Sequence, residues 1–258
     1  MPGCGSVRWP ARSGAVTLLA VSRTQAGASP GVRVGRVVIP LSTARSWIQV
    51  YTDAGRNRTS GRPYAYPAYD CYDGGTREPA RLTDGDLLAP LLLNVPVKIR
   101  SFYALQRIRP QLEDALRLPV LGQPLADIED TLDLEAAVRA MYGLLETTIP
   151  GTGVKATTLS KVLHRKRPDS MVLHDRWVRA CYVGDKAPVP LDRHRTWADY
   201  MVQVTAAIQH DVATQREEFA DLRECVQGPQ PLSDIRLLDI LAWTSQGNMP
   251  IETAASLP

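Results

Sequence analysis

The residues best suited to chemistry lie in two short segments, and the first is a glycine-rich turn. Ile149-Pro150-Gly151-Thr152-Gly153-Val154-Lys155 separates two stretches of helical periodicity, at about 133–147 and 154–166. Two glycines one residue apart let a backbone approach a ligand closely, and a lysine at the mouth of a helix stands where N–H groups favour an anion. Asp175 follows twenty positions after Lys155, within Val172-Leu173-His174-Asp175-Arg176-Trp177. We expect the two segments to form one active site.

Composition leaves the class of the protein open but shows an uneven charge. The chain has 258 residues, 44% hydrophobic and 22% charged, with a net charge of +3, as in an ordinary globular protein. Between Lys155 and Arg179, seven basic residues stand against two acidic ones. This basic stretch is either a nucleic-acid contact or a solvated face.

Cysteine spacing and hydropathy exclude several classes of protein. Cys4, Cys71, Cys181 and Cys225 form no CxxC pair, which argues against a zinc or iron–sulfur site and favours reduced thiols in a cytoplasm. No apolar run reaches the ~18 residues typical of a membrane helix. We therefore expect a cytoplasmic protein that does not act at a membrane.

The first 80 residues divide into two parts. Residues 1–35 mix arginine with small residues and predict a poorly ordered arm, since the apolar run at 15–21 is short for a secretory signal. Residues 36–80 predict a strand-to-helix passage and then a loop, Arg62–Gly75, with four tyrosines in nine positions. These tyrosines either stack on bases or pack on the main domain.

Helical periodicity dominates from residue 81 to 245. Thr83 caps a predicted helix that ends before Pro96, a second helix begins at Ile99 and is interrupted by Pro110, and a third covers 111–118. A helix from about 133, a long one from Trp197 and a last one through Leu241 follow, before a tail at 246–258. The predicted fold class is all-α.

The turn and the aspartate segment together resemble a known superfamily. Ile-Pro-Gly-Thr-Gly-Val-Lys between two helices is similar to the Leu-Pro-Gly-Val-Gly-x-Lys hairpin of the helix-hairpin-helix DNA glycosylases. Val172–Val178 is similar to that superfamily's Val-Pro-Val-Asp-x-His segment, at about the same separation. The resemblance is best from 133 to 183, with the helix-hairpin-helix at 133–166, and plausible by helix pattern alone from 81 to 130. The Lys/Asp pair is nearest the 8-oxoguanine glycosylase-like branch without an iron–sulfur cluster.

The resemblance implies roles for particular residues. Asp175 is the essential carboxylate, which stabilises positive charge on the sugar or positions the nucleophile. Lys155 attacks C1′ to give a Schiff base and lyase activity; its alternatives are a phosphate contact or an ion pair with Asp175. The hairpin and the basic residues contact DNA phosphates. These DNA-binding residues are Gly151, Thr152, Gly153, Lys161, Arg165, Lys166, Arg167 and Arg176.

Two further sites are expected. The carbonyls of Thr147, Ile149 and Thr152 match positions that hold a monovalent cation in the superfamily, and no other cofactor is implied. The base pocket is assigned to Trp177, Tyr69, Tyr72 and Asp70, the last as an acceptor for an exocyclic group. The sequence departs from the family at His174, which replaces an apolar residue, and at Trp177, which replaces a histidine and stacks on a base or packs in the core.

The expected function is that of a DNA glycosylase that flips out and excises a damaged or modified base and leaves an abasic site. The target is an oxidised purine, in repair, or an enzymatically modified phage base, in antiviral defence. Double-stranded DNA is the expected partner of a monomeric chain with no obligate protein partner. The alternatives are a non-catalytic helix-hairpin-helix DNA-binding protein and a helical scaffold.

Overall fold

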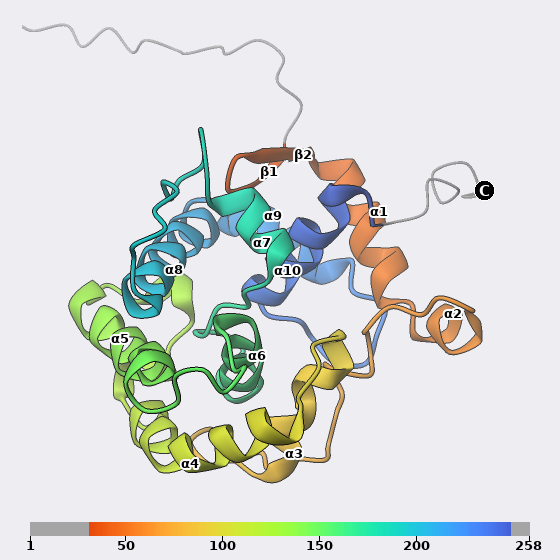
Figure 1. Cartoon of the computed structure of the whole chain (residues 1–258). Coiled ribbons are helices and arrows are strands. Elements are labelled where there is room, and N and C mark those ends of the chain that lie inside the picture. Colours follow the sequence, from red (N-terminus) through yellow and green to blue (C-terminus); the bar gives the residue numbers. More distant parts are fainter. Residues whose placement is uncertain (1–30, 249–258) are drawn as a thin grey trace, which may run out of the picture.

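A computed structural model describes residues 31–248, and this part of the chain is mostly helical (Figure 1). Its one sheet is a hairpin in which β1 (Gly31–Val34) pairs antiparallel with β2 (Val37–Pro40). Val32 and Val34 are fully buried, so the predicted arm is corrected over 31–35, where the chain already contributes to the core. The rest of the arm, 1–30, and the tail from 249 lie outside the described residues.

Ten α-helices follow the hairpin in the described part. The first half of the chain forms α1 (Leu41–Thr52), α2 (Ala54–Thr59), α3 (Asp84–Leu88) and α4 (Ile99–Leu116). The second half forms α5 (Thr131–Thr147), α6 (Ala156–Lys166), α7 (Arg176–Tyr182), α8 (Trp197–Thr214), α9 (Arg216–Glu224) and α10 (Asp234–Trp243). Short 3₁₀ turns lie at Ala89–Leu93, Pro119–Gly122 and Leu125–Asp127, and a π-helical turn lies at Thr244–Asn248.

One helix boundary predicted from proline was wrong. Pro110 lies inside α4, which continues to Leu116. A proline inside a helix removes one backbone hydrogen bond and crowds the preceding turn. Leu105, Ile108 and Leu112 are fully buried on both sides of it, and this packing holds the two halves as one helix.

Helix α6 is the centre of the fold. In Figure 1 it lies in the middle of the view with the other helices around it. Nine of its eleven residues are buried, including the polar Ser160 and the charged Lys161 and Lys166. The basic pattern after the hairpin therefore belongs to an interior helix and not to a solvated face.

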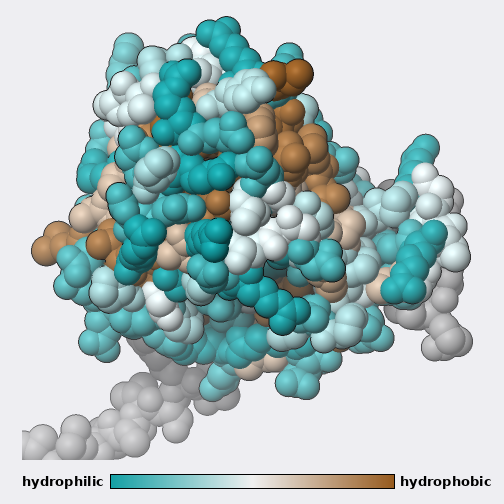
Figure 2. Space-filling model, turned by 90° about the horizontal axis from the view of Figure 1, so that it is seen from below, coloured by the Kyte–Doolittle hydropathy of each residue, from teal (hydrophilic) through white to brown (hydrophobic). Residues whose placement is uncertain are grey.

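The surface has a different character from this core. Figure 2 shows a face that is largely hydrophilic, with separate hydrophobic patches. Among the described residues, no helix combines the length and the hydropathy needed to cross a bilayer.

A buried ion pair joins α6 to the end of the tyrosine-rich loop. Lys166 Nζ lies 3.3 Å from Asp86 Oδ2 and donates to the Thr76 carbonyl, and both charged side chains are at most 1% exposed. Burial lowers the pKa of Lys166, and the Asp86 carboxylate opposes that shift. Asp86 also forms the capping box of α3 with Thr83. A Cβ at Gly75 would lie 2.1 Å from Asp86 Oδ1, so the loop requires glycine there.

Replacing Asp86 by alanine should destabilise the protein strongly. The change leaves the Lys166 ammonium buried without its counter-charge, which costs about 3–5 kcal/mol for a broken buried pair. Urea unfolding would measure the loss. Asp114→Ala is the matched control, because Asp114 pairs with Arg117 on the surface and its removal should leave the midpoint nearly unchanged. Equal midpoints for the two variants would contradict the importance of the Lys166–Asp86 pair.

Candidate active site

The predicted hairpin forms a tight turn between α5 and α6. Gly151 and Gly153 have φ values of 68° and 87°, a region that favours glycine, and Ser101 Oγ donates to the Thr152 carbonyl at 3.3 Å. Ile149 and Val154 are buried on either side, so the turn between them is presented at the surface. Helix α6 begins after Lys155 without a side-chain cap. The N–H groups of its first turn are therefore oriented toward any anion at the hairpin.

Asp175 caps the N-terminus of α7. Its Oδ1 accepts hydrogen bonds from the backbone N–H groups of Trp177 at 2.8 Å and Val178 at 3.1 Å. The side chain is 21% exposed, and Oδ2 is directed toward Lys161. One carboxylate oxygen is thus fixed by the helix while the other remains available to a ligand.

Lys161 is the lysine that lies beside Asp175. Its Nζ is 3.6 Å from Asp175 Oδ2, and its side chain is only 2% exposed. The neighbouring Ser160 holds the two segments together, because its Oγ accepts from the His174 N–H at 3.1 Å. Tyr69 Oη donates to the Lys161 carbonyl at 2.9 Å. The tertiary contacts of α6 therefore set the distance between amine and carboxylate.

Asp175 and Lys161 open into a cavity of about 710 Å³. The cavity is lined by charged side chains and by aromatic rings. Both kinds of side chain suit a charged, planar ligand. Four cationic side chains face two carboxylates. These six residues are Arg62, Lys161, Arg176 and Arg236, with Asp175 and Asp239.

Aromatic side chains line the cavity in two groups. In the first, Tyr51 stacks on Tyr64 with centroids 5.1 Å apart, and Trp243 meets both edge-on at 5.8 Å. The second is Trp177, which lies under the guanidinium of Arg176, 4.1 Å from the ring centre. Aromatic rings in a cavity suit a planar heterocycle.

Arg236 organises the cavity floor from α10. Its guanidinium donates to both oxygens of Asp70, at 2.8 and 3.1 Å, and to Tyr51 Oη at 3.2 Å. It also donates to Asp239 Oδ2 at 2.5 Å. Burial raises the pKa of Asp239, and Lys161 and Arg236 counteract that rise. This network fixes the Asp239 carboxylate at the cavity.

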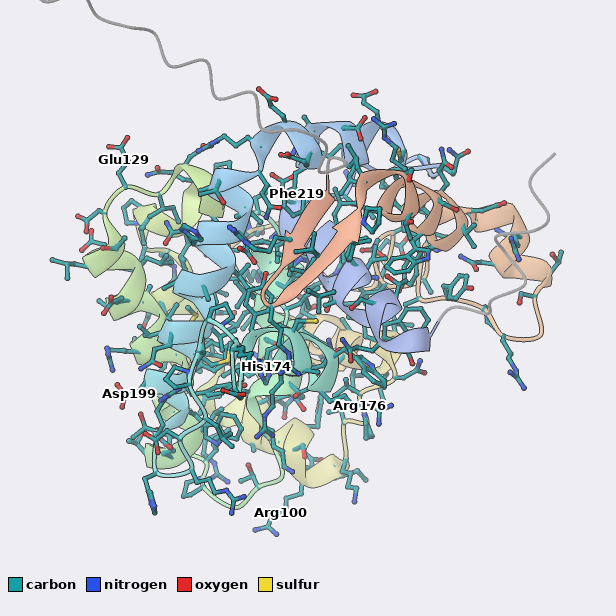
Figure 3. All side chains as sticks on the ribbon, turned by 90° about the horizontal axis from the view of Figure 1, so that it is seen from above. Arg100, Glu129, His174, Arg176, Asp199 and Phe219 are labelled. Atoms are coloured by element: carbon teal, nitrogen blue, oxygen red, sulfur yellow. The ribbon has the colours of Figure 1, made fainter. Side chains whose placement is uncertain are left out.

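The structure separates the predicted DNA-binding residues into exposed, buried and half-buried groups. Gly151, Gly153 and Arg176 are exposed, and Figure 3 shows Arg176 near the edge of the molecule. Burial corrects the surface phosphate role predicted for Lys161 and Lys166, whose charges are paired inside. Two predicted contacts are half-buried and already engaged within the chain: Arg165 over the Tyr72 ring at 5.4 Å, and Arg167 in a hydrogen bond to the Leu116 carbonyl at 2.7 Å.

Of the four residues predicted to form the base pocket, Trp177 lines the cavity. Tyr69 is buried and donates to Lys161, Asp70 is held by Arg236, and Tyr72 lies against Arg165. These three predictions are corrected, because the side chains are committed to packing and none lines the cavity. Tyr64, from the predicted tyrosine-rich loop, also lines the cavity, whereas Tyr51, Arg236, Asp239 and Trp243 were not predicted from the sequence. The only local signal for the floor was an Arg and an Asp three positions apart in a helix otherwise rich in leucine and isoleucine.

The remaining predicted residues lie in or near the hairpin. Lys155 is exposed and is not among the cavity residues. Of the carbonyls proposed as cation ligands, that of Ile149 accepts from Thr152 Oγ1 at 2.8 Å and that of Thr152 accepts from Ser101. Two of the three thus already accept a hydrogen bond within the protein, and the cation site remains a prediction. Thr147, the third, ends α5.

Comparison with known proteins identifies the family but not the activity. The profile of a family described as "Family of unknown function (DUF6308)" matches residues 44–246. The chain belongs to this family. The match includes the hairpin, Asp175 and every cavity residue named above. No curated protein and no solved structure matches the chain.

His174 is a buried titratable side chain next to Asp175. It lies inside the molecule in Figure 3, its Nε2 lies 2.8 Å from Tyr200 Oη, and its Nδ1 has no partner among the described residues. Burial lowers the pKa of His174 from 6.5 to about 4, although the Asp175 carboxylate opposes the shift. A neutral histidine suits the position where the superfamily pattern has an apolar residue.

We expect His174→Gln to reduce the pH dependence of stability. Since the folded-state pKa is below the unfolded value, the contribution of His174 is complete above pH 6.5 and is lost as the pH falls toward 4. Between pH 7.5 and 5 this is about 2 kcal/mol of unfolding free energy. Urea unfolding of the unchanged protein and of His174→Gln at these two pH values isolates the contribution of His174. The other buried histidine, His164, is present in both proteins, so its contribution cancels in the comparison. Identical pH dependence would mean that His174 is not the titrating group.

Proposed function

We propose that this protein is a DNA glycosylase that extrudes a damaged or modified base from duplex DNA and excises it. The observation that carries the proposal is Asp175, which lines a cationic cavity with aromatic side chains, together with the glycine turn that precedes α6. The turn suits a backbone phosphate and the cavity suits a planar heterocycle with its sugar. The first turn of α6 connects the two, because it follows the glycine turn and supplies Thr157 to the cavity.

We infer different roles for these two parts. The backbone N–H groups of the hairpin hold a phosphate of the DNA strand, while Arg62 and Arg176 attract its neighbours to the cavity rim. The free oxygen of Asp175 then faces the sugar of the extruded nucleotide. As the bond between C1′ and the base breaks, this carboxylate stabilises the positive charge that develops on the sugar.

The walls favour a base with a large planar face. Trp177 and the Tyr51–Tyr64–Trp243 cluster stack on such a base, and Asp239 accepts a hydrogen bond from its edge. Both an oxidised purine and an enzymatically modified phage base fit this description, so repair and antiviral defence are the two biological settings of the proposal.

An excision screen with an Asp175→Asn variant tests this function. Duplexes with oxidised purines, deaminated bases or enzymatically modified phage bases are incubated with the protein and then treated with alkali, which cleaves at abasic sites. Asparagine can still cap α7, so the variant should fold, but the lost charge should reduce excision by about 100-fold or more. Asp130→Asn is the matched control, because Asp130 caps α5 in the same way away from the cavity. Absence of alkali-labile sites on every duplex, or full activity of Asp175→Asn, would exclude the glycosylase.

The hairpin generates a separate prediction about DNA affinity. Gly153→Ala strains a residue at φ 87°, where the new Cβ would lie 3.3 Å from Ser101 Oγ, and we expect it to weaken DNA binding about tenfold through a disturbed turn. Fluorescence anisotropy at several salt concentrations measures this loss. Gly122→Ala is the control, since a Cβ there meets nothing within 4 Å.

The same anisotropy measurements, together with the excision screen, distinguish a glycosylase from a non-catalytic DNA-binding protein. Salt-dependent affinity with no excision of any base would favour that alternative. If Gly153→Ala binds DNA as tightly as the unchanged protein, the hairpin is not the phosphate grip.

A further inference from the structure

We propose that Lys161, and not Lys155, is the amine that attacks C1′ of the substrate sugar. This inference rests on the proposed function and names a catalytic residue within it. The lysine at the hairpin position of the superfamily pattern, Lys155, is exposed and lies outside the cavity. Lys161 is six residues further along α6, inside the cavity and beside Asp175.

The five lysines of the chain can be compared directly, because all lie in the described part. Lys98, Lys155 and Lys186 are exposed, and Lys166 is committed to Asp86 and the Thr76 carbonyl. Only Lys161 among them lines the cavity. Any amine chemistry in this cavity by a lysine therefore belongs to Lys161.

The surroundings of Lys161 leave its ammonium group available. The side chain is 2% exposed, yet among the described residues Nζ has no hydrogen bond to a protein acceptor. Its one ionic contact, Asp175 Oδ2 at 3.6 Å, is longer than a hydrogen bond. A buried ammonium with unused donors that faces a cavity is suited to contact a ligand there.

Asp175 fixes where the sugar must lie relative to Lys161. If Asp175 Oδ2 contacts the sugar as proposed, then Nζ, 3.6 Å from the same oxygen, is within reach of C1′. The backbone hydrogen bonds to Asp175 Oδ1 and the Ser160–His174 bond hold both groups in place. The arrangement provides a nucleophile and an adjacent proton acceptor.

Proton transfers accompany the proposed attack of Lys161 on C1′. Lys161 gives a proton to Asp175, and Asp175 passes it to the departing base, so that Asp175 is a carboxylate again as positive charge develops at C1′. The lone pair of Lys161 forms a bond to C1′ as the bond from C1′ to the base breaks, and the electron pair of the broken bond leaves with the base. A proton then moves from the lysine nitrogen to O4′ as the ring opens, which leaves a protonated C1′=N imine on Lys161 and a hydroxyl at C4′.

Borohydride trapping on a duplex with a single abasic site tests the assignment without knowledge of the target base. The aldehyde form of the abasic sugar condenses with the amine and releases water, and borohydride reduces the imine to a stable amine. We expect a covalent adduct with the unchanged protein and its loss in Lys161→Arg and Lys161→Gln. Arginine retains the charge beside Asp175 but cannot act as a neutral amine, so Lys161→Arg separates the nucleophile from a merely electrostatic role.

Two lysine variants complete the comparison. Lys186→Ala, far along the chain on an exposed turn, is the control and should form the adduct as the unchanged protein does. Lys155→Ala tests the rival residue and should still form the adduct at saturating protein, even where its DNA affinity is lower. Loss of the adduct in Lys155→Ala, or its retention in Lys161→Arg, would overturn the proposal.

Peptide mapping of the unchanged protein decides the matter independently of variant folding. Modification of Lys161 blocks tryptic cleavage there and gives a DNA-linked peptide of residues 156–165, whereas modification of Lys155 gives residues 140–161. The first result supports the assignment. The second, or the absence of any adduct, refutes it. Base excision without an adduct would leave the proposed glycosylase intact and exclude Lys161 as its nucleophile.

Discussion

The burial of two lysines in the central helix is the constraint on which the rest of the fold depends. Removing an ammonium group from water costs several kcal/mol unless a counter-charge meets it inside the protein. Helix α6 carries two such groups, and each is paired with a carboxylate from a different part of the chain. Lys166 requires Asp86 before it in sequence, and Lys161 requires Asp175 after it. The positions of α3 and α7 follow from this requirement.

The cavity exists only because distant segments meet around Arg236. This single guanidinium binds Asp70 from the tyrosine-rich loop, Tyr51 from α1 and Asp239 from its own helix. Asp70, proposed to face a base, is thereby a structural support for residues that do face the cavity. Such a satisfied polar network gives a rigid floor, as a site with a defined geometry requires.

The hairpin and the cavity meet at α6 but use different parts of it. Its N-terminus supplies backbone donors at the surface, whereas its buried face supplies Thr157 and Lys161, one turn apart, to the cavity. The glycine turn and the carboxylate can therefore act on adjacent parts of one ligand. This separation also explains why a lysine at the turn and a lysine in the cavity are not interchangeable.

The sequence by itself determined the helical class and the glycine turn, and it identified Asp175 as a candidate catalytic residue. Turns and helix starts could be predicted because they depend on local backbone preferences. It did not determine which lysine lies beside Asp175. Basic residues stand on several sides of α6, so its periodicity does not mark the face that is buried. Only the tertiary structure decided that, since it brings Asp175 beside Lys161 in a cavity shared with α10 and leaves Lys155 exposed. The aromatic walls were equally beyond local inference, because Tyr51, Tyr64 and Trp243 come together from both ends of the described chain.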